Sequence, residues 1–349
     1  MPYFGMPGRR QLAWLAPLVA AIVAGGIVAG FSFGGSTHRS AVAAAPVLAG
    51  RPAQSFQEAL VLVVKAVSPS VVQIEDSIGL GSGIVLDDGG NIVTNAHVVG
   101  TAKRFVVTTS SGKRYPAKLV GSFPPDDLAV VKVTGATLKP ALFADSGKLQ
   151  VGDIALAIGN PLGLRSSVTE GIVSAIRSAV PEGNGNTLPS VVQTSAAINP
   201  GNSGGALVDL NGRVIGVPTL AATDPQLGGS APGIGFAIPS NLVRDIAGQL
   251  VKYGKVVDSH RAYLGIRVGD TGGNGVYVGA VTAGGPAAKA GIRAGDVIVS
   301  VDRKPAPTTD VLSAVLATLK PGKTVPVVVR HQNGKKTTVQ LTLGTYPGS

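Results

Sequence analysis

Short apolar segments alternate with turn-forming residues through most of the chain. Between about residue 70 and residue 240, runs rich in Val and Ile are separated by Gly, Asp and Asn. This alternation is typical of strands joined by hairpins, and its spacing favours a sandwich or a barrel. We predict strands over 70–74, 83–86, 91–94, 105–109, 127–133, 153–158, 171–175, 206–208 and 213–217.

A helical pattern closes this β-rich body. Apolar residues recur at helical spacing between Asn241 and Tyr253, and Gly254 follows as a stop signal. We therefore expect folded structure from about Ser55 and a first domain over residues 55–256.

A second unit, with a similar alternation of apolar segments and turn-forming residues, extends from Ala262 to Leu343. It combines a helical segment at 309–319 with apolar segments that favour strands. The strands are predicted at 276–278, 297–301, 324–329 and 337–341. We expect a separate domain over 257–345, so that the folded part of the chain is mainly β.

The N-terminal segment differs from the rest in its hydrophobicity. Residues 12–33 carry no charge and follow Arg9 and Arg10, and they are long enough to cross a hydrocarbon core of ~30 Å as a helix. The predicted parts are a cytoplasmic basic segment, a transmembrane helix and a flexible tether, over 1–11, 12–33 and 34–54. The alternative is a cleaved signal peptide, because Ala43 and Ala45 form an A-x-A pattern. We expect the remaining chain on the extracytoplasmic side, either held by a single span in the plasma membrane or secreted.

Composition excludes several classes of function. The chain has no cysteine, which removes disulfides, zinc–thiolate sites and cysteine nucleophiles, so covalent catalysis would use Ser, Thr or Lys. The net charge of +11 forms no strong cluster and aromatic residues make up 4%, which disfavours nucleic-acid binding. There is no H-E-x-x-H pattern either, and we expect neither a metal nor a cofactor.

A glycine-rich turn surrounds Ser203 and precedes an apolar strand. Glycines let neighbouring backbone amides converge on one point, which the stabilisation of a tetrahedral oxyanion requires. The candidate oxyanion hole consists of the amides of Gly201, Asn202 and Ser203. A phosphate nest is the alternative, disfavoured because no Lys follows the glycines and no helix-forming stretch begins there.

A serine nucleophile needs a general base and a carboxylate. His97 follows a predicted strand, where a general base is plausible. Asp127 begins another predicted strand, which would bury its carboxylate and let it fix the imidazole tautomer. Asp126 is the alternative, because a shift of one residue would exchange the two. The chain order His, Asp, Ser, with separations of 30 and then 76 residues, differs from the subtilisin and hydrolase-elbow orders.

These motifs resemble those of the HtrA family of trypsin-like serine proteases. The resemblance covers residues 55–343. It rests on segments of the first domain, which are TNAHVV at 94–99, DLAV at 127–130, NPGNSGGA at 199–206 and GIGFAIP at 233–239. The second domain resembles a PDZ domain through RAYLGI at 261–266 and GPAAKAGI at 285–292.

The resemblance implies a fold and an activity. It implies two perpendicular antiparallel β-barrels with the triad in the cleft between them, followed by a PDZ domain that adds a partner's C-terminal peptide as a strand. The implied activity is that of a membrane-anchored serine endopeptidase, acting as a homotrimer on unfolded, misfolded or regulatory proteins in envelope quality control or the stress response.

The resemblance also implies binding residues. By analogy, the carboxylate-binding loop of the PDZ domain consists of Tyr263, Leu264, Gly265 and Ile266. The substrate pocket consists of Ala197, Ile198, Val217 and Thr219. Because Ala197 is apolar and lies six residues before the nucleophile, where trypsin-like proteases carry the base of the pocket, small aliphatic residues are expected at the cleavage site. The sequence departs from many relatives at Ser195, where they have Asp.

Two other functions fit parts of the pattern. A non-proteolytic chaperone or PDZ scaffold on a protease fold would keep the architecture and bind the same peptides. A small-molecule esterase would use the same nucleophile, but a peptide-binding domain beside it would have no evident use.

Overall fold

The computed structural model describes residues 51–76, 79–160, 167–181, 187–199, 201–224 and 229–348. The predicted transmembrane helix over 12–33 lies outside them. Within the described ranges, no helix has both the length and the apolar character needed to cross a membrane.

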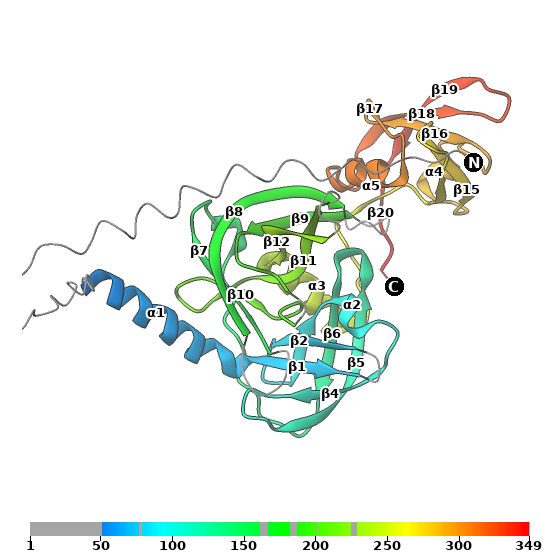
Figure 1. The fold of residues 1–349 in the computed structure, drawn as a ribbon. Coiled ribbons are helices and arrows are strands. Elements are labelled where there is room, and N and C mark those ends of the chain that lie inside the picture. Colours follow the sequence, from blue (N-terminus) through cyan, green and yellow to red (C-terminus); the bar gives the residue numbers. More distant parts are fainter. Residues whose placement is uncertain are drawn as a thin grey trace, which may run out of the picture. The chain divides into compact units, whose positions relative to one another are not determined.

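Helix α1 (Arg51–Val67) comes first and leads through the 3-10 turn η1 (Ser68–Ser70) into the β structure (Figure 1). It begins inside the range predicted as tether and was not predicted as a helix. Val63 and Val67 are buried in the protein core, with Leu60 and Val64 packed beside them. The i, i+3, i+4, i+7 spacing of these residues is typical of the buried face of a helix. The helix was not predicted because this Val-rich run equally favours a strand.

The first barrel is closed, with strand order β1-β2-β3-β6-β5-β4. Its core contains Val72, Ile74, Ile92, Val107 and Val131, each at most 1% exposed. Two short helical turns, α2 (Ala96–Val99) and η2 (Pro124–Asp126), interrupt it directly after β3 and directly before β6. The strands are β1 (Val71–Glu75), β2 (Leu80–Val85), β3 (Asn91–Thr94), β4 (Arg104–Thr108), β5 (Arg114–Phe123) and β6 (Leu128–Val133).

The second barrel is also closed, in the order β10-β11-β12-β9-β8-β7, and helix α3 (Ser240–Tyr253) follows it. A shared core joins α3 to both barrels, with Val130 of β6, Leu156 of β7, Ile238 of β12 and Ile246 of α3 in one cluster. The strands are β7 (Ile154–Gly159), β8 (Ser167–Pro181), β9 (Thr187–Thr194), β10 (Ala206–Val208), β11 (Val214–Asp224) and β12 (Gly229–Pro239), and η3 (Ser146–Lys148) precedes β7. Burial of this core fixes the two barrels side by side.

The C-terminal unit has its own core and its own sheet. Strands β14-β15-β16-β18-β19 follow one another in the sheet, with β17 paired to β16, while β13 and β20 form a separate pair. Helix α5 (Thr309–Ala317) packs Leu312 and Val315 into the core. The other elements are β13 (Ala262–Tyr263), β14 (Ile266–Asp270), β15 (Val276–Val281), α4 (Pro286–Lys289), β16 (Val297–Val301), β17 (Lys304–Pro305), β18 (Thr324–Arg330), β19 (Lys336–Thr342) and β20 (Gly344–Thr345).

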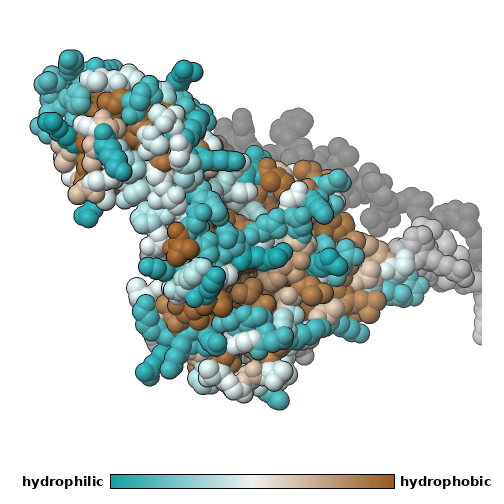
Figure 2. Space-filling view, turned by 180° about the vertical axis from the view of Figure 1, so that it is seen from behind, coloured by the Kyte–Doolittle hydropathy of each residue, from teal (hydrophilic) through white to brown (hydrophobic). Residues whose placement is uncertain are grey.

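The surface mixes apolar and polar residues. Figure 2 shows apolar surface interspersed with hydrophilic residues on the face that it presents. The most exposed large apolar side chains among the described residues are Leu142 at 68%, Val151 at 67% and Leu62 at 64%. Single exposed apolar residues of this kind are ordinary on a folded domain.

Candidate active site

The imidazole of His97 is held against a buried carboxylate. His97 lies on α2, and its Nδ1 is 2.8 Å from Oδ2 of Asp127, while its backbone N–H donates to Oδ1 at 3.0 Å. The Asp127 side chain is 6% exposed and that of His97 49% exposed. One edge of the ring is therefore fixed by the protein, while about half of the side chain is exposed.

The turn before β6 gives Asp127 its orientation. After the 3-10 turn η2, Asp127 adopts the left-handed conformation with φ 49° and ψ 42°, and its N–H donates to Pro124 O at 2.9 Å. Aspartate tolerates this region better than most residues. The carbonyl of Asp127 accepts from the backbone N–H of Ala96 at 3.1 Å and from Asn95 Nδ2 at 3.0 Å. The same residue thus fixes both the imidazole and the start of the helix that carries it.

Thr219 of β11 completes the surroundings of the carboxylate. Its Oγ1 donates to Oδ2 of Asp127, so that donors from both barrels surround an acceptor-only group. From the sequence, Thr219 is predicted to lie in the substrate pocket. In the structure its hydroxyl binds Asp127, and this role was missed because the two residues are 92 positions apart in the chain.

Ser203 lies on a turn that is held by contacts with residues of both barrels. Ser82 of β2 donates its backbone N–H to Ser203 O at 3.0 Å and its hydroxyl to Gly201 O at 2.6 Å. The side chain of Asn202, 2% exposed, accepts from Asn199 N–H and donates to Ala197 O, both at 3.0 Å. Ser203 itself is half-buried, so the residue is partly accessible to solvent on a turn that these hydrogen bonds hold in place.

Gly204 brings this turn against the chain that leads to His97. It has φ +77°, and its N–H donates to Pro218 O at 3.0 Å. A Cβ here would lie 2.3 Å from Ser82 O and 2.5 Å from Thr94 Oγ1. Since α2 begins just after Thr94, the close approach that only glycine allows brings the turn of Ser203 and the helix of His97 together.

Replacing Gly204 by alanine should therefore disturb the site and the fold together. We expect a loss of about 2 to 4 kcal/mol in the free energy of unfolding, from the clash and from the left-handed backbone, with a large fall in activity. The matched control is Gly112→Ala, which has φ +80° and no atom within 4 Å of the added Cβ. It should cost about 1 kcal/mol and leave kcat unchanged. Thermal unfolding and hydrolysis assays measure both, and a fully active Gly204→Ala protein would contradict the packing argument.

The predicted oxyanion donors are not equivalent. The amide of Asn202 donates to Asn199 O at 3.1 Å, so it is engaged inside the turn. The prediction that Asn202 donates to an oxyanion does not fit this bond, because a single N–H is already used. The amides of Gly201 and Ser203 remain candidates.

Only some of the residues predicted to form the substrate pocket are accessible to solvent. Ala197 is exposed, whereas Ile198 is 7% exposed and lies where a Cβ on Gly235 would come within 2.3 Å of its Cγ1. Val217 is fully buried in the core that joins the barrels. Val217 thus supports packing and does not line a surface that a substrate can reach.

Ser195, the departure from many relatives, has a defined place. Its Oγ accepts from Ile172 N–H at 3.0 Å, and its N–H donates to Ile172 O at 3.1 Å. These bonds attach the start of the segment that leads to Ser203 to β8. The hydroxyl thus anchors this segment without a carboxylate.

The C-terminal unit contains a cavity beside the predicted carboxylate-binding loop. A cavity of about 250 Å³ is lined by all four predicted residues and by apolar side chains of β14 and α5. Gly265 has φ +76°, the buried Leu264 accepts from Ala287 N–H at 2.8 Å, and Tyr263 Oη is 3.2 Å from Thr282 Oγ1. The loop is thus fixed at the end of a groove between a strand and a helix.

Comparison with known proteins identifies both domains. Residues 81–217 match the trypsin-like peptidase domain, and residues 262–343 match the PDZ domain. The chain is 40% identical over 334 residues to the serine protease PepD of Mycobacterium tuberculosis, covering 89% of this chain and 70% of PepD. It is 39% identical to the serine endoprotease DegS of Escherichia coli, covering 77% of this chain and 78% of DegS.

The fold also resembles that of a solved protease. The solved structure of the HtrA-type protease AlgW with a decapeptide has a TM-score of 0.58 and 32% identity, over 82% of this chain and 98% of that one. The fold and the matches define a trypsin-like serine protease with a C-terminal PDZ domain. The chain belongs to the HtrA family and is a serine endopeptidase of that type. It spans 60% of the length of another relative, the periplasmic endoprotease DegQ of Escherichia coli.

Proposed function

We propose that this protein is a membrane-anchored serine endopeptidase with His97, Asp127 and Ser203 as its catalytic triad. The observation that carries the proposal is the His97–Asp127 pair, with Nδ1 and Oδ2 2.8 Å apart, together with the close approach of the Ser203 turn to the start of the helix that carries His97. Ser203 Oγ attacks the substrate carbonyl, and His97 takes its proton and later delivers it to the leaving amine. Water then hydrolyses the acyl-enzyme by the same proton route.

The negative charge of the tetrahedral intermediate needs fixed donors. The amides of Gly201 and Ser203 are the proposed ones. Support comes from the contacts of Ser82, which hold the carbonyls of the same two residues at 2.6 and 3.0 Å. A turn held at these carbonyls loses little entropy when it binds the intermediate.

The PDZ domain is proposed to bind the C-terminus of a partner or substrate. β14 stands at the end of the sheet order, so that among the described strands it has one unpaired edge for an added strand. Backbone amides of residues Tyr263 to Ile266 would receive the terminal carboxylate, and Leu312 and Leu316 of α5 line the cavity. An apolar C-terminal residue fits this lining.

We propose that the catalytic and PDZ domains, over 55–256 and 257–345, lie on the extracytoplasmic side and that residues 12–33 anchor them in the plasma membrane. The relatives DegP and DegQ are named periplasmic endoproteases, which supports this side of the membrane. Unfolded, misfolded or regulatory envelope proteins are the proposed substrates, in quality control or the stress response, and a homotrimer is the proposed assembly.

A fluorophosphonate probe tests the proposal directly. The full chain in detergent is incubated with the probe and, separately, with unfolded casein, with and without peptides that end in apolar residues. Labelling that maps to Ser203 supports the endopeptidase, provided that prior treatment with an active-site inhibitor abolishes both the labelling and the cleavage of casein. Peptide binding without labelling or cleavage under any condition would favour a chaperone or scaffold, and cleavage of small esters alone an esterase.

The exposed apolar residue Ala197 leads to a prediction about specificity. A peptide library should show small aliphatic residues before the cleaved bond, because an apolar position gives a cationic side chain no partner. Ala197→Asp should increase cleavage after Arg or Lys relative to Ala or Val. The control, Ala294→Asp, adds the same charge to an exposed turn of the PDZ domain and should leave the preference unchanged. A wild-type preference for Arg or Lys would overturn this assignment.

A further inference from the structure

The two adjacent aspartates Asp126 and Asp127 engage different parts of the molecule. Asp127 contacts His97, whereas Oδ1 of Asp126 lies 2.6 Å from Nη1 of Arg261. The Asp126 side chain is 0% exposed and that of Arg261 13% exposed. A buried ion pair thus lies one residue away from the carboxylate proposed to orient the catalytic base.

Arg261 also binds two backbone carbonyl groups. Its Nη1 also donates to Pro125 O, and its Nη2 donates to Thr187 O at the start of β9, both at 2.8 Å. The planar guanidinium fixes several acceptors in one geometry, which a lysine cannot reproduce. One side chain therefore ties the 3-10 turn of the first barrel to a strand of the second.

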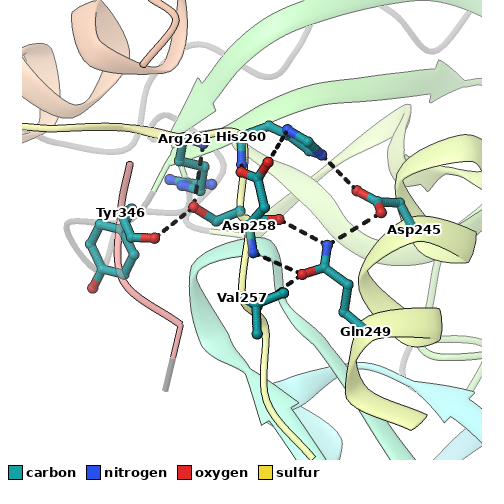
Figure 3. A network of polar contacts seen from close by, with 8 residues as sticks. Asp245, Gln249, Val257, Asp258, His260, Arg261 and Tyr346 are labelled. Atoms are coloured by element: carbon teal, nitrogen blue, oxygen red, sulfur yellow. Dashed lines mark hydrogen bonds and ion pairs between the residues drawn. The ribbon is translucent and has the colours of Figure 1, made fainter. Parts of the chain in front are cut away.

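The segment that carries Arg261 is itself anchored, as Figure 3 shows. Gln249 of α3 accepts from the backbone N–H groups of Val257 and Asp258 at 2.8 and 2.9 Å, and it donates to Asp258 O at 2.8 Å. His260 Nε2 lies 3.0 Å from a carboxylate oxygen of Asp245, also on α3. Arg261 therefore projects from a backbone whose position is set by α3.

On these contacts we propose that Arg261 is a positioning residue for peptide hydrolysis, because it fixes the Pro124–Asp126 turn and thereby the carboxylate of Asp127. The inference rests on the proposed function of His97, Asp127 and Ser203. The turn is a single 3-10 unit, and Asp127 follows it in a left-handed conformation. A small rotation between residues 126 and 127 moves Oδ2 away from the imidazole, and misplacement by about 1 Å can cost a hundredfold in rate.

The electrostatics of Asp126 explain why the turn depends on this arginine. Burial raises the pKa of Asp126, and the charge and hydrogen bond of Arg261 oppose that rise. Its Oδ2 is buried without a hydrogen-bond partner among the described residues. Without the guanidinium, the carboxylate would have to take up a proton or reach water, and a buried charge that loses its partner commonly forces such rearrangement. Either change moves the residue directly before Asp127.

The test compares variants of the full chain on a small activated ester, with active enzyme counted by fluorophosphonate titration. Arg261→Met removes the guanidinium, Arg261→Lys keeps only the charge, and Asp126→Asn keeps an acceptor without the charge. Lys323→Met is the matched control, because it breaks a half-exposed ion pair with Asp302 inside the PDZ domain, at 2.7 Å.

We expect Arg261→Met to lower kcat per active site by about ten- to a hundredfold at a nearly unchanged KM. The acid limb of its kcat/KM profile should move to lower pH, because a more distant carboxylate stabilises the protonated imidazole less. Arg261→Lys and Asp126→Asn should lie between this variant and the wild type. Lys323→Met should match the wild type.

The inference is overturned if Arg261→Met or, where that variant does not fold, both Arg261→Lys and Asp126→Asn keep kcat per active site within about twofold of the wild type. A fall in kcat without a shift of the acid limb also overturns it, since a purely structural ion pair would change the amount of folded enzyme and leave the imidazole unaffected. A wild-type chain that neither reacts with the probe nor hydrolyses the ester would instead refute the proposed function.

Discussion

Replacing Ser203 by alanine is expected to lower kcat for casein by about a million-fold, as the loss of the nucleophile does in subtilisin. The variant keeps the turn and its contacts with Ser82, because these involve backbone atoms of residues 201 and 203. Fluorophosphonate labelling should vanish with cleavage. The binding of C-terminal peptides to the PDZ domain should keep its Kd, because that groove is lined by other residues.

The measurement needs a serine control and a binding control. Ser111→Ala changes an exposed hairpin hydroxyl whose neighbour is Thr109, and it should hydrolyse casein like the wild type. Peptide binding is measured by fluorescence anisotropy on all three proteins. Residual labelling of Ser203→Ala at the wild-type rate would mean that another residue is the nucleophile, whereas loss of peptide binding would indicate misfolding.

The proposed site depends on contacts from both barrels, which hold its side chains in place. His97 and Asp127 belong to the first barrel, Ser203 and Thr219 to the second, and Ser82 of β2 holds the Ser203 turn. Each proposed catalytic side chain thus lies on or beside an element of the buried core. Such support preorganises the groups before substrate arrives.

Strands with strong local patterns could be predicted well. The predicted segments 91–94 and 206–208 coincide with β3 and β10, and the predicted helix 241–253 differs from α3 by one residue. Strand β8 runs from Ser167 to Pro181, whereas only 171–175 was predicted. Its remaining residues are mostly exposed or half-buried, so no apolar run marked them, and pairing with β7 and β9 defines their extent.

The candidate site could likewise be predicted only where short local motifs define its residues. Motif spacing singled out His97, Asp127 and Ser203, and Asp126 stayed open as an alternative because one residue of register separates them. In the structure Asp126 contacts Arg261, which is 135 positions away. Such partners follow from packing between distant segments, which residue types and spacing along one chain do not encode. The burial of Val217 and the bond of Thr219 to Asp127 depend on the same kind of distant contact.

The donors around Asp127 define what a conservative substitution would do there. Oδ1 accepts from the backbone N–H of His97, and Oδ2 receives Thr219 Oγ1 and faces His97 Nδ1. Both oxygens of a carboxylate can accept, whereas an asparagine side chain has one oxygen and one NH₂ group. If asparagine replaces Asp127, its NH₂ group therefore faces a donor in either orientation of the amide.

The Asp127→Asn variant should therefore fold, yet lose about 10⁴-fold in kcat. If the NH₂ group faces the ring, His97 must present Nδ1 as an acceptor, and the proton on Nε2 then prevents it from taking the proton of Ser203. If it faces the backbone N–H of His97, that bond is lost and the start of α2 shifts. Burst kinetics with an activated ester, combined with circular dichroism, separate these effects from unfolding, and Asp310→Asn on the partly exposed start of α5 is the control. A folded Asp127→Asn enzyme that keeps more than about a tenth of the wild-type kcat would show that Asp127 does not orient the base.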